Sequence, residues 1–249
     1  MSFTPPDTFN ISDYFLDDRI REGRGDRVAL RTPAGDLTYA EIQAMAGRFA
    51  HLLEGAGVLP EQRVLLALAD GPELVAALFG TLKIGAVVVM VNPGLPADSI
   101  REFLDYTRAA AVVVDSGSAP AVRRAAHGAR HLRRVLDLTD SNVVAELDRS
   151  PAEIENFPSH RDDPAIWLFS GGTTGIPKAV VQPHASYANT TELYAKGVLR
   201  IGEDDVTISV PKLYFGYAMG SNLLFPFSVG GSAVLFPEPV TPAVLFDAI

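Results

Sequence analysis

One short segment contains the residues best suited to bind phosphate. It combines three glycines, three hydroxyl side chains and one lysine, and its members are Ser170, Gly171, Gly172, Thr173, Thr174, Gly175 and Lys178. Glycine lets backbone N–H groups approach an anion closely, hydroxyls add donors, and lysine supplies a positive charge. Each hydrogen bond to a charged group contributes about 1.5 to 3 kcal/mol. The segment predicts a site for the phosphates of a nucleotide, and the alternative is a connecting loop without a ligand.

This segment does not match the Walker A pattern. That pattern has Ser or Thr after its lysine and continues into a helix, whereas Lys178 lies between Pro177 and Ala179. The apolar run 165–169 comes directly before the segment and predicts a buried strand. We expect a return strand that includes residues 180–181, so that a polar loop joins two strands.

A second segment, residues 211–220, combines aromatic side chains with glycine. It follows a predicted buried strand over residues 206–210. Because α/β proteins bind small ligands at the carboxyl edge of a sheet, Phe215, Gly216 and Tyr217 are candidates for the wall of a pocket for a flat ligand. The alternative is that these aromatic side chains are ordinary core residues.

Together the two segments resemble the acyl-adenylate-forming superfamily, whose phosphate-binding signature is commonly written S-G-T-T-G-x-P-K. Gly171 stands where the family usually has serine, and Ala179 stands where it usually has glycine. Many members have histidine where this chain has Phe215, and aryl-CoA ligases of the benzoate-CoA ligase group share the aromatic residue. From Trp167 to Pro237 the chain is similar to that group, whereas the earlier part is similar only to the superfamily in general.

The resemblance implies a two-step reaction. An aromatic carboxylate, of the benzoate or 2-aminobenzoate type, would attack the α-phosphorus of MgATP to give an aryl-adenylate and pyrophosphate, and CoA would then displace AMP to form a thioester. The first segment would hold the β- and γ-phosphates, and Phe215, Gly216 and Tyr217 would line the pocket for the acid. Mg²⁺ is expected to bridge phosphate oxygens and to need few protein ligands. No residue is assigned as a metal ligand or as a certain catalytic residue.

Two other functions stay open. The chain could belong to an adenylation domain that loads an aromatic acid onto a carrier protein, or it could be a non-catalytic nucleotide-binding module. Superfamily members are substantially longer, and their later motifs are absent here: a threonine-glutamate pair, a ribose-binding aspartate and a lysine of the C-terminal domain. We therefore expect residues 1–249 to be an incomplete N-terminal adenylation domain, inactive alone, whose partner is its own missing C-terminal part.

Composition narrows the class of protein. The 249 residues are 47% hydrophobic and 20% charged, which is enough to bury a large core. The net charge is −9 and the basic residues are scattered, so we expect no nucleic-acid partner. The absence of cysteine excludes disulfides, thiolate metal sites and a cysteine nucleophile. Without a signal-peptide pattern or an apolar run of about 18 residues, we expect a cytoplasmic protein without membrane segments.

The remaining pattern predicts the scaffold that positions these segments. Thr38 and Glu41 have the spacing of a capping box at the start of a helix. Apolar strands alternate with helices, and the further predicted elements are strands 28–31, 64–68, 87–91 and 111–115 and helices 73–84, 98–106 and 184–198. This alternation indicates a doubly wound α/β fold with a parallel sheet covered on both faces. We expect two approximate subdomains, 55–185 and 1–54 with 186–249.

One histidine and one run of arginines each have two interpretations. His184, at the start of a predicted helix, either contacts the ligand region or is an ordinary helix-start histidine. The arginines between 123 and 134 are expected on a solvated helix face, and the alternative is a contact with the nucleotide end of CoA.

Overall fold

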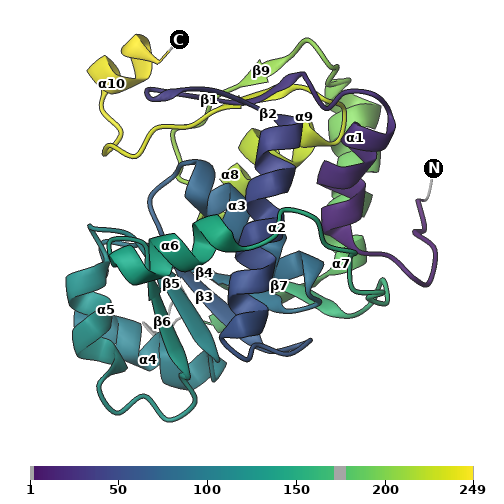
Figure 1. Cartoon of the computed structure of the whole chain (residues 1–249). Helices are drawn as coiled ribbons and strands as arrows, with labels where there is room; N and C mark the ends of the chain where they lie inside the picture. Colours follow the sequence, from purple (N-terminus) through teal and green to yellow (C-terminus); the bar gives the residue numbers. More distant parts are fainter. Residues whose placement is uncertain (1–2, 171–177, 249) are drawn as a thin grey trace.

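The computed structural model describes residues 3–170 and 178–248, and this part of the chain contains two sheets. In order across the larger sheet, the strands are β6 (Arg134–Asp137), β5 (Ala111–Val114), β3 (Arg63–Ala67), β4 (Val87–Met90), β7 (Pro164–Ser170) and β8 (Lys178–Pro183). The smaller sheet has the order β2 (Gly35–Thr38), β1 (Val28–Thr32), β10 (Ser232–Val234) and β9 (Val206–Thr207). Figure 1 shows the smaller sheet above the larger one.

Helices connect and cover these strands. They are η1 (Asp13–Asp17), α1 (Asp18–Arg21), α2 (Tyr39–Gly55), α3 (Pro72–Lys83), α4 (Ala97–Thr107), α5 (Ala119–Ala126), α6 (Ser141–Arg149), α7 (His184–Thr190), η2 (Thr191–Leu199), α8 (Gly216–Met219), η3 (Gly220–Leu224), α9 (Phe225–Phe227) and α10 (Pro242–Asp247). In the described part of the chain, no helix is both long and apolar enough to cross a membrane.

Side chains of the larger sheet are buried on both faces. Along β3, Val64 and Leu66 belong to the core that includes α2 and α3, whereas Leu65 and Ala67 pack into a second core with α4 and α5. This period of two arises because successive side chains of a strand point to opposite faces. Strands β3 to β7 are parallel, while β8 returns antiparallel to β7. The predicted doubly wound fold and the predicted return strand are therefore confirmed.

Two helices between the sheets pack unusually closely. The predicted capping box at Thr38 and Glu41 begins α2, where the Thr38 hydroxyl accepts the Glu41 N–H and the Glu41 carboxylate accepts the Thr38 N–H. In α3, a Cβ on Gly80 would lie 2.7 Å from the carbonyl oxygen of Ala46 in α2. Glycine at this position thus lets the two helices approach, and α2 reaches from one sheet toward the other (Figure 1).

The predicted buried strand over 206–210 is wrong in its length and its burial. Strand β9 comprises only two residues, and the side chains of Val206 and Val210 are 51% and 57% exposed. The reason is position, because β9 pairs with β10 alone at the edge of the sheet and has little to pack against.

The arginine run does not form one helix face. Arg123 and Arg124 lie on α5, whereas Arg134 begins β6, a strand that the apolar pattern did not predict. Arg123 pairs with Asp137 at 2.5 Å, and Arg134 pairs with Glu146 of α6. These two arginines therefore hold the edge of the larger sheet to its neighbouring elements.

Candidate functional site

The two ends of the predicted phosphate segment lie opposite each other. Ser170, the last residue of β7, is in register with Lys178, the first residue of β8. Lys178 is exposed, as a lysine that binds a ligand must be. The residues between them that were assigned to the nucleotide, Gly171, Gly172, Thr173, Thr174 and Gly175, lie outside the described residues. The two strands on either side of the segment, β7 and β8, are antiparallel neighbours, as expected from the sequence.

Two aromatic side chains of the second segment, Phe215 and Tyr217, are exposed, whereas Tyr214 is half-buried and packs against the core. Phe215 is 52% exposed and caps the amino end of α8, and Tyr217 in the first turn is 75% exposed. The backbone between them is anchored, because the Tyr187 hydroxyl of α7 donates to the Gly216 carbonyl at 3.3 Å. The two rings are thus available to a ligand, while the hydrogen bond from Tyr187 fixes the backbone at Gly216.

The two segments adjoin at the carboxyl end of β7. A Cβ built on Gly216 would lie 2.6 Å from Cδ1 of Leu168, which is two residues before Ser170 on β7. At such a distance the end of the Leu168 side chain would have to move to admit a side chain at position 216. The predicted acid pocket therefore begins within a few residues of the point where the phosphate segment leaves the sheet.

A buried carboxylate that sequence reasoning missed also reaches the second segment. Asp70 follows β3, is 6% exposed, and accepts the backbone N–H of Leu213 at 3.1 and 3.2 Å from its two oxygens. Burial raises the pKa of Asp70 to about 6, opposed by the Leu213 hydrogen bond and the Lys212 charge. The signal in the sequence was an aspartate directly after an apolar strand, at the edge where α/β proteins bind ligands.

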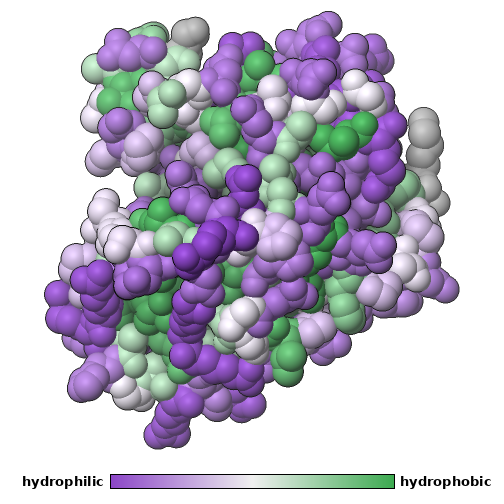
Figure 2. All heavy atoms as spheres, viewed as in Figure 1, coloured by the Kyte–Doolittle hydropathy of each residue, from purple (hydrophilic) through white to green (hydrophobic). Residues whose placement is uncertain are grey.

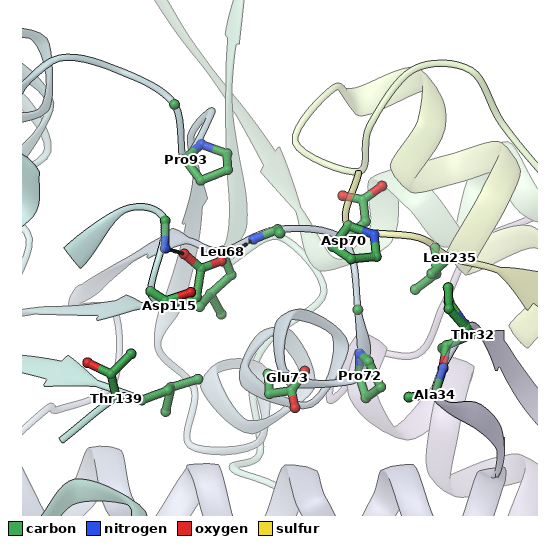
Figure 3. A pocket seen from close by; sticks show the side chains of 18 of the residues that line it. Thr32, Ala34, Leu68, Asp70, Pro72, Glu73, Pro93, Asp115, Thr139 and Leu235 are labelled. Carbon is green, nitrogen blue, oxygen red and sulfur yellow. Dashed lines mark hydrogen bonds between the residues drawn. The ribbon is translucent and has the colours of Figure 1, made fainter. Parts of the chain in front are cut away.

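An open hollow of about 870 Å³ lies at the same edge of the larger sheet. Residues after β3, β5 and β6 and at the start of α3 line it on one side, and residues near β1 and β10 line it on the other. They include Thr32, Asp70, Glu73, Asp115, Thr139 and Leu235 (Figure 3). Figure 2 shows the surface hollowed between α10 and the larger sheet with its helices, which lie below α10 in this view. Among the described residues, no three His, Asp or Glu side chains are grouped so as to hold a metal ion.

His184 has a structural role, which is the second of its two interpretations. It is 1% exposed at the start of α7, and its Nδ1 accepts the backbone N–H of Ile11 at 3.1 Å. Burial lowers the pKa of His184 to about 4, with partial compensation from Asp163. The imidazole is therefore a neutral acceptor that joins the first helical segment to α7.

Comparison with known proteins identifies the family. The model of the AMP-binding enzyme family matches residues 17–249. The chain belongs to this family. Among curated AMP-binding enzymes, it is 33% identical to the benzoate-CoA ligase of Thauera aromatica over 98% of this chain and 47% of the relative. It is 34% identical to a salicyl-AMP ligase / salicyl-S-ArCP synthetase of Mycobacterium tuberculosis, over 90% of this chain and 42% of the relative.

Solved structures of AMP-binding enzymes show the same fold. The crystal structure of the anthranilate CoA ligase AuaEII in complex with anthranoyl-AMP matches 97% of this chain and 46% of that one, with 29% identity and a TM-score of 0.91. This likeness confirms that the two sheets belong to an adenylation domain. The chain spans about half the length of the AMP-binding relatives that it matches.

Proposed function

We propose that the whole protein is an ATP-dependent, AMP-forming ligase that activates an aromatic carboxylic acid and transfers it to CoA. The observation that carries this proposal is the junction at β7, where Leu168 packs against Gly216 two residues before the phosphate segment begins. A carboxylate bound beside Phe215 and Tyr217 would thus lie near a nucleotide bound by that segment. The similarity to a benzoate-CoA ligase and to an anthranilate CoA ligase supports an aromatic acid.

The residues of this chain have two tasks in the proposed adenylation step. Ser170, Thr173, Thr174, Lys178 and the glycine amides would hold the β- and γ-phosphates, where negative charge increases as pyrophosphate leaves. Phe215, Gly216 and Tyr217 would orient the aromatic ring so that the carboxylate oxygen faces the α-phosphorus. A Mg²⁺ ion bound with ATP would neutralise part of the phosphate charge and would need few ligands from the protein.

A second candidate is loading of an aromatic acid onto a carrier protein. It is favoured by the 34% identity to a salicyl-S-ArCP synthetase, which is as high as the identity to the benzoate-CoA ligase. The two functions share the adenylation step and differ in the thiol that accepts the acyl group. An assay of thioester formation with CoA and, separately, with a phosphopantetheinylated carrier protein distinguishes them.

ATP-pyrophosphate exchange on the full-length gene product tests the proposed function. The assay is scanned over benzoate, 2-aminobenzoate, hydroxybenzoates and short aliphatic acids. We expect exchange that depends on an aromatic acid and that is weak with aliphatic acids. Absence of exchange with every acid, together with measurable ATP binding, would favour a non-catalytic nucleotide-binding module instead.

A further inference from the structure

The segment that leads to the proposed acid pocket is tied to the larger sheet by one carboxylate. Asp70 is the third residue after the end of β3, and both of its oxygens lie within 3.2 Å of the Leu213 nitrogen, 143 residues later in the sequence. Leu213 is fully buried, so its N–H has no access to solvent. Loss of the acceptor would leave a buried donor unsatisfied and would release the backbone just before Phe215.

Asp70 is itself held in place by the neighbouring strand end. The N–H of Ala69, the residue before it, donates to Oδ2 of Asp115 at 2.7 Å. The other oxygen of Asp115 accepts the N–H groups of Gly117 and Ser118, so Asp115 closes the turn after β5. Figure 3 shows Asp70 and Asp115 at two neighbouring strand ends with Leu68 between them. The acceptor for Leu213 therefore projects from a braced part of the sheet.

Lys212, the residue directly before Leu213, ties the same segment to the smaller sheet. Nζ of Lys212 donates to the carbonyl oxygen of Phe236 at 2.5 Å and lies 4.0 Å from the centre of the Phe236 ring. Phe236 follows β10, so Lys212 and Leu213 connect adjacent backbone positions to different sheets. With Tyr187 bound to Gly216, the segment has three anchors, and the exposed rings of Phe215 and Tyr217 lie at its end.

We propose that Asp70 is a positioning residue for the aromatic-acid pocket, and that it acts through the Leu213 N–H to fix Phe215, Gly216 and Tyr217 relative to β7. This inference rests on the proposed function. Asp70 does not touch the acid in this arrangement. Its loss is expected to misplace the pocket wall while the nucleotide-binding segment on β7 and β8 stays where it is, so binding of the acid and binding of ATP should respond differently.

The test uses the full-length gene product and ATP-pyrophosphate exchange with the best aromatic acid. Asp70→Ala removes the acceptor, Asp70→Asn keeps one side-chain oxygen as an acceptor, and Asp137→Ala is the matched control, a 5% exposed aspartate at the end of β6. For Asp70→Ala we expect KM for the acid to rise about tenfold or more, with KM for ATP changed less than about twofold. We expect Asp70→Asn to stay within about threefold of the wild type, and Asp137→Ala to leave both constants unchanged.

Two results would overturn the inference while leaving the proposed function intact. One is a wild-type exchange activity with an unchanged acid KM in Asp70→Ala, and the other is an equal rise in the KM values of acid and ATP. If Asp70→Ala does not fold, Asp70→Glu decides, because the longer carboxylate displaces Leu213: a selective rise in acid KM supports the inference and an unchanged value overturns it. Absence of exchange in the wild type is a different outcome, since it rejects the proposed function itself.

Discussion

Leu168 of β7 occupies the space that a side chain at Gly216 would need. Its Cδ1 lies 2.6 Å from the position of a Cβ at residue 216, and the hydroxyl oxygen of Tyr187 lies 3.4 Å from it. We predict that Gly216→Ala lowers kcat/KM for the aromatic acid about tenfold, because Leu168 has to turn away and the pocket wall shifts. The destabilisation should be about 1 kcal/mol, at the low end for overpacking, since only the end of a flexible side chain must move. Exchange kinetics and urea unfolding measure the two effects.

A double mutant shows whether the effect of Gly216→Ala arises from its contact with Leu168. Leu168→Ala makes room, so Gly216→Ala combined with Leu168→Ala should recover part of the activity that Gly216→Ala loses. Gly220→Ala is the matched control, because its Cβ would be no closer than 3.4 Å to the nearest atom, on the ring of Phe225. Strictly additive losses in the double mutant would contradict the predicted contact.

Tyr217 is expected to contribute to selectivity for aromatic acids. Tyr217 is 75% exposed, so removal of its ring should affect ligand binding more than folding. We predict that Tyr217→Ala reduces the ratio of kcat/KM values for benzoate and a short aliphatic acid about tenfold, in the range of a lost ring contact. An unaltered acid profile, with normal thermal unfolding, would remove Tyr217 from the pocket.

Lys178 is expected to act on the pyrophosphate side of ATP. It is exposed at the start of β8, in register with the last residue of β7. We predict that Lys178→Ala lowers kcat/KM for ATP by about a hundredfold, because a charged hydrogen bond to the leaving phosphates is lost. Arg130→Ala, which removes an exposed cation elsewhere, should have no effect. An unchanged kcat/KM for ATP in Lys178→Ala would exclude this role.

Stability should fall in acid because His184 is buried in its neutral form. Its pKa of about 4 in the folded protein lies below the value of about 6.5 for a free histidine. The unfolded chain therefore takes up a proton first as the pH falls, so the stabilisation is present above about pH 6.5 and is lost toward pH 4, by about 3 kcal/mol. We predict that His184→Asn, which keeps an acceptor for Ile11, has a smaller loss of unfolding free energy between pH 7 and pH 4.5. Equal losses in both proteins would contradict this.

The buried ion pair between Lys83 and Asp17 should matter far more than an exposed one. Nζ of Lys83 lies 2.6 Å from Asp17, and the two side chains are 3% and 7% exposed. We predict that Lys83→Met costs about 3 kcal/mol of unfolding free energy, since the buried carboxylate loses its cation and keeps only the hydrogen bonds from Gln43 and Asn156. The control is Arg31→Met, which breaks an exposed pair with Asp36 and should cost less than about 1 kcal/mol. Similar costs in the two variants would show that burial does not decide the effect.

Local patterns in the sequence determined much of the larger sheet. Runs such as Val64 to Leu68 are apolar at every position and only five residues long, which is typical of a strand covered on both faces. The capping box at Thr38 and Glu41 set the start of α2, and the apolar pair Val180 and Val181 indicated the return strand β8. These features depend on neighbours within a few residues, so the sequence alone was sufficient to find them.

Tertiary structure decided the features that depend on distant neighbours. Val206 and Val210 belong to a run, residues 206–210, whose composition is typical of a buried strand. They are nevertheless exposed, because β9 lies at a sheet edge and ends at Thr207. Likewise, His184 is an internal acceptor only because Ile11 comes to it from 173 residues away in the sequence. Asp70 reaches Leu213 only because the segment after β3 meets the segment that leads to α8. Burial and hydrogen-bond partners are properties of packing, whereas periodicity and capping are properties of the local chain, and this difference separates what the sequence determined from what the fold added.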